Sequence, residues 1–348
     1  MSALLERSPY GERDESAFLS ELRALTEHHL GSCAEYSRIW PRWKRSNEVA
    51  DFPFLHVGTF KSVPFVTSGS GLKHQRVLKS SATSSGISSQ IMLDQHSVEL
   101  QSRSSNAILS DFLGTERRPL VVLDSVAGLR SGAEISARTA AALSLKPLSS
   151  DIVFLLKDSS DPASARWDQL LRLLENNDSL LIYGFTFILW SAWAAAEMPD
   201  DLRTALRGKR IDFVHSGGWK KLEYLSVSRK EFDLALTRDL DPRSGVLDFY
   251  GLVEQVGVVY PLCSAGSRHV PIWADVLVRD PWTMAPMFDS EGQLQLVNLL
   301  AWGAPYHNVL TEDLGRIIPG ECTCGRKGKR FEFTRRMPKA EMRGCANV

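Results

Sequence analysis

The sequence predicts an α/β fold in which sheets are flanked by helices, and the alternation of its apolar runs carries this prediction, within bounds set by composition and length. Short apolar runs of strand length alternate with segments of helical periodicity, a pattern typical of a sheet with helices on its faces. The composition, with 43% apolar and 24% charged residues, is that of an ordinary globular protein. A length of 348 residues provides enough chain for a substantial core. Ligands of such folds bind at strand ends.

The expected elements follow in chain order. Residues 15–36 are predicted to form a helix, because apolar residues such as Phe18 and Leu22 recur at helical spacing. An aromatic-rich segment follows, and we expect residues 1–75 to pack on a core made of residues 76–348. Within that core the strand-like runs are 76–78, 119–123, 152–156, 180–182 and 211–214, and the helical runs are 165–175 and 189–198.

Charge and hydropathy exclude several classes of function. The 41 basic and 41 acidic residues give zero net charge, so no field attracts nucleic acid or an anionic membrane surface. Residues 1–18 are charged, unlike a secretory signal, and we expect a cytoplasmic protein. The uncharged run 180–196 approaches the length of a membrane span. We favour a strand followed by a buried helix, because buried parallel strands also read as continuous apolar runs, and we expect no membrane span.

The cysteines point to metal binding. Five cysteines, an odd number, in a chain without an export signal argue against a disulfide framework. Cys263 and His269 form C-x5-H, and Cys322 and Cys324 form C-x-C. Three thiolates and one imidazole suit a tetrahedral Zn²⁺ with no open position, which would be structural. The alternative is four unlinked residues. An acidic turn, residues 311–316, lies just upstream of the second pair.

A serine-rich stretch, KSSATSSGISSQ at residues 79–90, is a candidate phosphate-binding loop. Small hydroxylated residues around a glycine allow close backbone approach and offer N–H and O–H donors to phosphate oxygens. The alternative is a flexible surface loop.

Three further stretches follow in order. Gly217 and Gly218 would let a flat ring lie against the backbone. Tyr250 offers a ring for stacking on a base, and Glu254 offers a carboxylate for Mg²⁺. Asp313 would accept both hydroxyls of a ribose. Each also has an ordinary explanation, namely a glycine turn, a strand end or a solvated charge.

Together these motifs resemble the core motifs of adenylate-forming enzymes, the superfamily of acyl-CoA synthetases and related ligases. More narrowly, HSGGWKKLE, DFYGLVEQVG and CTCGRKGKRFEFTRRMPKAEMRGC resemble the acyl-protein synthetase of the bacterial luciferase fatty-acid reductase complex. Phenylacetate-CoA ligases are similar in placing a cysteine and a histidine after the carboxylate that corresponds to Glu254, and a C-x-C near the C-terminal end. The resemblance runs from about Lys79 to Cys345.

The resemblance implies ATP-dependent activation of a carboxylic acid to an acyl-adenylate, with release of pyrophosphate. Each predicted role belongs to a residue of this sequence, in chain order: Ser84, Ser85 and Gly86 on the β and γ phosphates, Gly217 and Gly218 along the adenine, Tyr250 stacked on it, Glu254 on Mg²⁺, Asp313 on the ribose, and Arg330 or Arg335 on a ribose or phosphate oxygen. The Zn²⁺ would tie the segment after Tyr250 to the loop after Asp313.

The chain also departs from the pattern of the superfamily. A glycine is common where this chain has Thr83, and a lysine is common where it has Gln90, which would weaken the grip on pyrophosphate. The resemblance implies the large N-terminal domain of the fold without the full mobile C-terminal domain. The acyl group is then expected to pass to a thiol, either the chain's own Cys345 or one on a reductase or carrier-protein partner. Nearby Arg343 would lower the pKa of the Cys345 thiol. The alternative for Cys345 is a stray exposed cysteine.

The acid itself is poorly specified by the sequence. Residues 183–193 and Trp219 would line a pocket for an alkyl chain or an aryl ring, although such residues more often belong to a core. A fatty acid is expected, and an aryl or acyl ligase that uses CoA or a carrier protein is the alternative. A different class, a non-catalytic scaffold subunit, stays open because of the altered serine loop.

Overall fold

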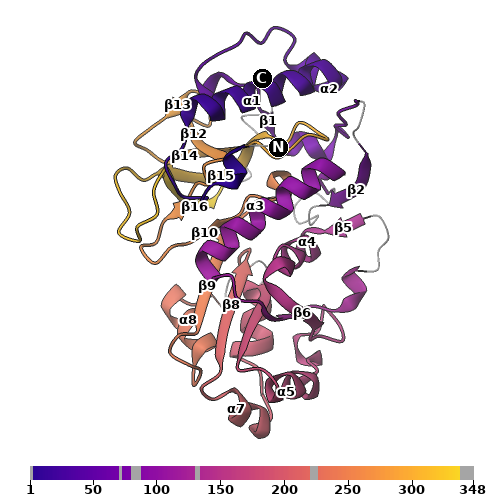
Figure 1. The fold of residues 1–348 in the computed structure, drawn as a ribbon, viewed down its shortest axis with the longest axis vertical. Coiled ribbons are helices and arrows are strands. Elements are labelled where there is room, and N and C mark those ends of the chain that lie inside the picture. Colours follow the sequence, from indigo (N-terminus) through magenta and orange to yellow (C-terminus); the bar gives the residue numbers. More distant parts are fainter. Residues whose placement is uncertain (1–2, 70–72, 80–87, 130–133, 220–225, 338–348) are drawn as a thin grey trace. The chain divides into compact units, whose positions relative to one another are not determined.

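The computed structural model describes residues 3–69, 73–79, 88–129, 134–219 and 226–337. The chain divides into two compact units (Figure 1). Unit 1 comprises residues 1–108 and 251–348, and unit 2 comprises residues 109–250. The predicted boundary between residues 75 and 76 stays a prediction.

Unit 2 is built on a parallel sheet. Five of its strands lie in the order β9, β8, β7, β4, β6, and each pair is parallel. Their bounds are β4 Arg118–Val122, β6 Ser149–Phe154, β7 Ser179–Phe185, β8 Arg210–Ser216 and β9 Gly245–Tyr250. Four helices follow strands of this sheet or connect them: α5 Trp167–Glu175, α6 Thr186–Leu189, α7 Asp200–Leu206 and α8 Arg229–Thr237. A short strand and helix, β5 Glu134–Ser136 and α4 Ala137–Leu143, precede β6.

The strands of unit 2 are apolar for nearly their whole length. Leu180, Leu181 and Ile182 of β7 are fully buried, as are Val121 and Phe213 in the neighbouring strands. Central parallel strands covered on both faces lose the apolar–polar alternation of a half-exposed strand. The strands predicted at residues 119–123, 152–156, 180–182 and 211–214, and the helix predicted at 165–175, are confirmed within a few residues.

The uncharged run 180–196 is a strand and a helix, as favoured from the sequence. It covers β7, α6 and one π-helical turn at Trp190–Ala194. No helix in the described parts of the chain is long and apolar enough to cross a bilayer.

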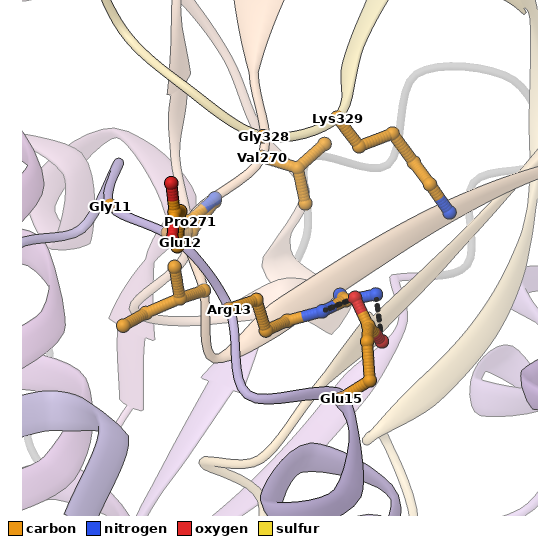
Figure 2. Close-up of a pocket in the computed structure, with 9 residues that line it drawn as sticks. Gly11, Glu12, Arg13, Glu15, Val270, Pro271, Gly328 and Lys329 are labelled. Carbon is orange, nitrogen blue, oxygen red and sulfur yellow. Dashed lines mark hydrogen bonds and ion pairs between the residues drawn. The ribbon is translucent and has the colours of Figure 1, made fainter.

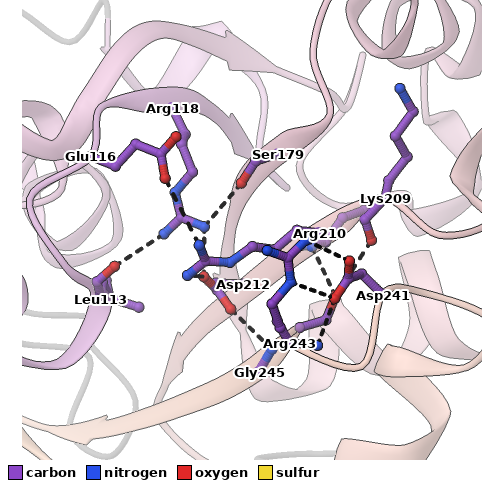
Figure 3. Close-up of polar contacts among 12 residues, drawn as sticks. Leu113, Glu116, Arg118, Ser179, Lys209, Arg210, Asp212, Asp241, Arg243 and Gly245 are labelled. Atoms are coloured by element: carbon purple, nitrogen blue, oxygen red, sulfur yellow. Dashed lines mark hydrogen bonds and ion pairs between the residues drawn. The ribbon is translucent and has the colours of Figure 1, made fainter.

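The amino ends of the unit 2 strands are held by a buried ion-pair cluster (Figure 3). Asp212 Oδ2 lies 2.5 Å from Arg118 Nη1 and 3.2 Å from Arg210 Nη2. The other oxygen, Oδ1, accepts a hydrogen bond from the Gly245 N–H at 3.0 Å. Because these residues begin β4, β8 and β9, one carboxylate fixes the alignment of three strands at the edge opposite their carboxyl ends.

Unit 1 contains a mainly antiparallel sheet. Its long strands are β12 Ala274–Arg279, β14 Gly292–Asn298, β15 Asn308–Ile317 and β16 Arg330–Arg336, paired in that order. Short strands extend it: β1 Leu55–His56 pairs parallel with β15, β11 Arg268–His269 pairs with β16, and β13 Pro286–Met287 pairs with β12. Strand β10 Tyr260–Pro261 precedes β11, and β2 His74–Lys79 and β3 Gln90–Asp94 form an antiparallel pair.

The N-terminal helix is shorter than predicted. Helix α1 spans Glu15–Ser32, with the Asp14 side chain accepting the Ala17 N–H at 3.0 Å as its N-cap. The backbone becomes extended at Cys33, and α2 Ala34–Ile39 begins after it. Gly31 and Ser32 are weaker helix formers than the residues before them, which helps to end the helix there. A third helix, α3 Gln95–Leu113, follows β3.

Candidate functional site

The predicted metal ligands of unit 1 come together. Cys263, His269, Cys322 and Cys324 each offer one ligand atom, and these atoms lie within 4.8 Å of one another. The Cys263 and Cys322 sulfurs are 3.7 Å apart, and Cys324 Sγ is 3.2 Å from His269 Nε2. The sulfur separation is far longer than the 2.0 Å of a disulfide. The convergence of the four side chains is therefore a feature of the fold.

Two tight turns and one strand pair create this convergence. The Cys263 carbonyl accepts the Gly266 N–H at 2.9 Å, and the Cys322 carbonyl accepts the Gly325 N–H at 3.0 Å. Both glycines have positive φ, 76° and 83°, a conformation that other residues adopt with strain. Strand β11 pairs His269 with Arg330 of β16, which brings the two turns to the same end of the sheet.

The donor set fits a zinc ion. Tetrahedral bonds of about 2.3 Å to sulfur separate two sulfurs by about 3.8 Å, close to the 3.7 Å observed for Cys263 and Cys322. Burial raises the pKa of Cys263. Burial also acts to raise the pKa of Cys322, but hydrogen bonds from the Cys324 backbone and from neighbouring side chains outweigh it and lower the pKa to about 7. A thiol that ionises near neutral pH is a good metal ligand.

Glu254, the predicted Mg²⁺ ligand, is buried in unit 1. It lies in the 3-10 turn Val253–Gln255 (η9) and is 4% exposed. Burial raises the pKa of its carboxyl group, a hydrogen bond with Ser89 and the charge of Lys61 oppose the rise, and the charge of Glu312 adds to it. Carboxylate and hydroxyl oxygens are the ligand types that Mg²⁺ prefers, and a cation would offset the unfavourable burial of the carboxylate. The residues present thus fit the ion.

The segment predicted as an acidic turn is a buried strand, so that prediction is wrong. Thr311 to Arg316 belong to the ten-residue strand β15, and Asp313 is only 8% exposed. The Asp313 N–H donates to Thr311 Oγ1 at 3.1 Å, and that hydroxyl donates to the Leu294 carbonyl at 2.8 Å. Three charged residues within six suggest a solvated turn, but β15 is a central strand of the sheet, paired with β14 on one edge and with β16 on the other, and Glu312 and Asp313 are buried.

Strand pairing separates the two candidate arginines. Asp313 pairs with Arg336, and Leu314 with Arg335, so Arg335 lies near the ribose-binding candidate. Arg330 lies five residues before Arg335 on β16, about 17 Å along the strand. There it donates to the Pro319 carbonyl at 2.9 Å and contacts Cys322 beside the metal ligands. Arg335 is thus the closer of the two to Asp313 along the strand, and its side chain lies 3.4 Å from Glu291.

The adenine-site candidates lie at the carboxyl ends of strands in unit 2. Gly217 and Gly218 directly follow β8, and Tyr250 is the last residue of β9. Gly217 has a φ of 74°, and a Cβ at either glycine would have no heavy atom within 4 Å. The backbone there has open space beside it, as the approach of a flat ring requires.

His215 lies in β8, two residues before Gly217, and is buried. Its Nδ1 is 3.0 Å from Thr186 Oγ1, and that hydroxyl is 2.7 Å from the Gly217 carbonyl. Because a carbonyl only accepts, the Thr186 proton goes to Gly217 and His215 Nδ1 is the donor to Thr186. The pair fixes the chain where Gly217 leaves the strand.

Several predicted residues lie outside the described parts of the chain. These are Thr83, Ser84, Ser85 and Gly86 of the serine loop, and Arg343 and Cys345 near the end. The frame of the serine loop is described, because Lys79 of β2 pairs with Gln90 of β3. The serine loop therefore connects two antiparallel strands.

The residues proposed to line an acid pocket are mostly core. Tyr183, Leu189, Ala192 and Trp193 are at most 5% exposed and pack inside unit 2. Half-buried aromatic rings also lie at the carboxyl ends of the strands, where Trp190 and Trp219 meet edge to face with ring centroids 5.5 Å apart.

A separate pocket of unit 1 contains none of the predicted site residues (Figure 2). Its lining combines the N-terminal residues Gly11, Glu12, Arg13 and Glu15 with Val270, Pro271, Ile272, Gly328 and Lys329. Arg13 lies 2.8 Å from Glu15 and 3.1 Å from buried Asp275, and Lys329 also pairs with Asp275. Since its cations are already compensated, we assign this pocket no role in the chemistry.

Sequence reasoning missed the partners of the predicted carboxylates. Lys61, Ser89 and Glu312 act on Glu254, and Arg336 Nη2 lies 2.9 Å from Glu312 Oε2. The sequence offered only a weak sign of these partners: Glu312 is next to Asp313, and Arg336 is next to Arg335. These contacts join segments that are far apart in the sequence.

Known proteins resemble the chain at the level of sequence. A profile of the family described as acyl-protein synthetase, LuxE, matches residues 10–348. The long-chain-fatty-acid–luciferin-component ligase of Aliivibrio fischeri is 28% identical over 142 residues, 40% of this chain and 37% of the relative. The protein with the same name from Vibrio harveyi is 28% identical over 153 residues, 43% of this chain and 39% of the relative. The chain thus matches about two-fifths of the length of these curated relatives.

Solved structures resemble the chain at the level of fold. An open conformation of 2-hydroxyisobutyryl-CoA ligase in complex with 2-HIB-AMP and CoA has a TM-score of 0.65 at 16% identity, covering 92% of this chain and 74% of that chain. The same ligase in the postadenylation state has a TM-score of 0.63, also at 16% identity, with 92% and 67% covered. This likeness confirms the predicted α/β fold of adenylate-forming enzymes. With the profile match over nearly its whole length, the chain belongs to the acyl-protein synthetase, LuxE, family.

Proposed function

We propose that this chain activates a carboxylic acid with ATP and transfers the acyl group to a protein thiol. The observation that carries the proposal is the match of the family profile to residues 10–348, on a chain whose described parts have the fold of an adenylate-forming ligase. The 2-hydroxyisobutyryl-CoA ligase with this fold was solved in complex with an acyl-adenylate and CoA, the two kinds of molecule that such a reaction uses.

The reaction has two steps. A carboxylate oxygen of the acid attacks the α-phosphorus of ATP, the bond to the β-phosphate oxygen breaks, and pyrophosphate leaves. A thiolate then attacks the acyl carbon of the adenylate, a thioester forms and AMP leaves. Such chemistry depends mainly on placing the attacking oxygen in line and on neutralising phosphate charge.

The nucleotide-binding roles are assigned residue by residue. Ser84, Ser85 and Gly86 would bind the β and γ phosphates, and Gly217, Gly218 and Tyr250 would hold the adenine. Asp313 would accept the ribose hydroxyls, and Arg335 would bind a ribose or phosphate oxygen. The open space beside the two glycines and the burial of Asp313 support these roles.

Glu254 would hold Mg²⁺, which supplies neutralising charge to the phosphates when it is bound. The carboxylate is buried next to the Ser89 hydroxyl, so it is held away from bulk water. This chain's own contribution is to orient that carboxylate.

We infer a structural Zn²⁺ at Cys263, His269, Cys322 and Cys324. The fit of the sulfur separation to tetrahedral geometry supports it. All four positions are protein ligands, so the ion would tie the two turns together without taking part in the chemistry.

For the acceptor thiol we propose Cys345. The described chain ends at Met337, whose N–H donates to the Glu312 carbonyl at 2.9 Å, next to Asp313. Cys345 is the eighth residue after Met337, so the covalent chain limits its distance from this anchor to about 28 Å. A thiol on a reductase or carrier protein is the other acceptor class, and cytoplasmic location stays a prediction.

A non-catalytic scaffold is the second candidate function, favoured by Thr83 and Gln90 in place of the common glycine and lysine. A fatty acid is the expected substrate, and the half-buried Trp190 and Trp219 rings also suit an aryl acid.

The deciding experiment is a pyrophosphate-release assay with a panel of fatty and aryl acids, run with mass spectrometry of the intact protein. The proposed function predicts release with at least one acid and a hydroxylamine-labile acyl adduct. The adduct disappears in Cys345→Ala while pyrophosphate release persists. No release with any acid would favour the scaffold, and a Cys345→Ala protein that still carries the adduct would move the acceptor elsewhere.

A further inference from the structure

Gln255, the residue after Glu254, is fully buried and has hydrogen-bond partners at both ends of its amide. Its Nε2 donates to the carbonyls of Leu296 at 3.3 Å and Tyr306 at 3.0 Å. Its Oε1 accepts from Asn298 Nδ2 at 3.0 Å. The partners lie on β14 and just before β15, so the side chain joins the turn η9 to the central strands of the sheet.

Asn298 and Tyr306, which bind the Gln255 side chain, are themselves held by hydrogen bonds. Asn298 Nδ2 also contacts the Tyr306 carbonyl at 3.3 Å, and its Oδ1 accepts the Leu300 N–H at 2.8 Å. Asn298 and Tyr306 are at most 1% exposed. Buried amides whose donors and acceptors are all used hold a single orientation, because each lost bond costs about 1–3 kcal/mol.

The chain just after this turn, at Gly257, contacts helix α3. Gly257 has a φ of 86°, and a Cβ there would lie 2.5 Å from the Cα of Gln101. The Ser105 hydroxyl donates to the Gly257 carbonyl at 3.3 Å, and Gln101 Nε2 donates to the Tyr306 hydroxyl at 2.8 Å. The turn that carries Glu254 is therefore anchored on both sides.

We propose that Gln255 is a positioning residue that holds the Glu254 carboxylate in the geometry needed to bind Mg²⁺ with the nucleotide. The proposal rests on the proposed function. Because Glu254 sits directly before the anchored amide, release of Gln255 lets the carboxylate shift while it stays buried. Loss of a supporting contact behind a metal ligand typically costs about 10-fold to 100-fold in metal affinity.

The test compares two buried glutamines. Gln255→Met keeps the volume of the side chain and removes its hydrogen bonds. Gln295→Met is the matched control: Gln295 is equally buried, accepts from Arg279 and donates to Asn308 Oδ1 at 2.7 Å, but belongs to β14 rather than to the turn. Both variants lose a buried amide, so both should unfold at a lower temperature than the wild type.

The primary readout is ATP binding by calorimetry, titrated with Mg²⁺ and separately with Mn²⁺ as a spectroscopic probe. We expect Gln255→Met to need about 10-fold more Mg²⁺, with unchanged metal-free ATP binding. Gln295→Met should show the same Mg²⁺ dependence of ATP binding as the wild type. In the pyrophosphate assay, saturating Mg²⁺ should restore the rate of Gln255→Met to within about twofold of the wild type, which a merely structural role would not do.

Each other outcome counts against the proposal. Equal Mg²⁺ dependence in all three proteins, or an equal loss in both variants, overturns it. If the wild type itself shows no Mg²⁺-dependent ATP binding, the proposed function fails, and the positioning role fails with it. If Gln255→Met does not fold, Asn298→Ala removes the donor to Gln255 from the other side and should give the same shift in Mg²⁺ dependence.

Discussion

Two buried polar clusters, one in each unit, hold separate segments of backbone together, and they differ in the source of the compensating charge. In unit 2 the Asp212 carboxylate is paired with Arg118 and Arg210 (Figure 3). In unit 1 Cys263, Cys322, Cys324 and His269 converge, and none of these four side chains carries a permanent positive charge. The first cluster is compensated by two arginines of the chain. At the second, Arg330 contacts the Cys322 thiol, and the proposed Zn²⁺ would balance the charge of the other thiols.

The difference bears on stability. A buried ion pair contributes little net stability compared with an apolar replacement, because removing both charges from water is costly. Losing one partner is expensive, since a charge then stays buried alone. In the unit 1 cluster the proposed Zn²⁺ would play the part of both arginines. Four experiments test this difference between the clusters.

The largest effect is expected from Cys263→Ser. We predict that zinc falls from about one equivalent to below about 0.2, and that the free energy of unfolding falls by more than about 5 kcal/mol, since structural zinc contributes about 10–16 kcal/mol in small domains. Elemental analysis and urea unfolding measure the two quantities. Cys33→Ser, which alters a buried cysteine outside the cluster, should keep its zinc. If the folded wild-type protein contains less than about half an equivalent of zinc, the proposed metal site is contradicted.

Breaking the ion-pair cluster should cost somewhat less. Asp212→Ala leaves Arg118 buried without its partner and should lower the free energy of unfolding by about 3–5 kcal/mol, measured by urea denaturation. The double change Arg118→Met with Asp212→Leu removes both charges and should recover much of the loss. A double variant as unstable as Asp212→Ala would show that shape, rather than charge, dominates this edge of the sheet.

A third buried cluster contains only neutral groups. The rings of His29 and His307 stack with centroids 4.8 Å apart, and His307 Nε2 is 3.1 Å from Thr26 Oγ1. Burial, with the charge of His28, lowers the pKa of His307 to about 3. Burial, with the charge of His307, also holds the pKa of His29 well below its usual value.

This cluster predicts a pH dependence. The unfolded chain binds a proton below about pH 6.5 while folded His307 does not, so stability falls as the pH drops. From pH 7.5 to 5, His307 should account for about 2 kcal/mol of that loss. His307→Gln should therefore show a smaller loss than the wild type in urea unfolding at pH 7.5 and 5. An identical loss in both proteins would contradict the neutral state of His307.

The smallest effect is expected at the exposed edge of β16. Arg336 is 59% exposed and pairs with buried Glu312 at 2.9 Å. Arg336→Ala should lower the free energy of unfolding by less than about 1 kcal/mol, because solvent screens the exposed guanidinium. If Arg336→Ala lowers the free energy of unfolding as much as Asp212→Ala in the same urea experiment, this prediction is contradicted. Ion pairs with one exposed partner would then also contribute substantially to stability.

Local patterns were sufficient for several features. The apolar runs of β7 and β8 predicted buried parallel strands, and the uncharged run from residue 180 was a strand followed by a helix. The spacing of Cys263, His269, Cys322 and Cys324 predicted a convergence that the structure contains. Each of these signals depends on residue type and short spacing.

Other features depended on contacts that no local pattern encodes. The charged run from Thr311 to Arg316 suggested a solvated turn, but flanking strands bury it. Gln255 is held by Tyr306, 51 residues further along the chain, and a lone glutamine carries no signal of such a contact.

Residue types and their spacing were thus enough to predict the class of fold, the strands of the parallel sheet and the members of the Cys/His cluster. Packing between distant segments set which carboxylates are buried, which of Arg330 and Arg335 lies closer to Asp313 along the strand, and what anchors the turn of Glu254. The physical reason is that residue type and periodicity fix local conformation, while strand register and burial arise only when distant segments pack together.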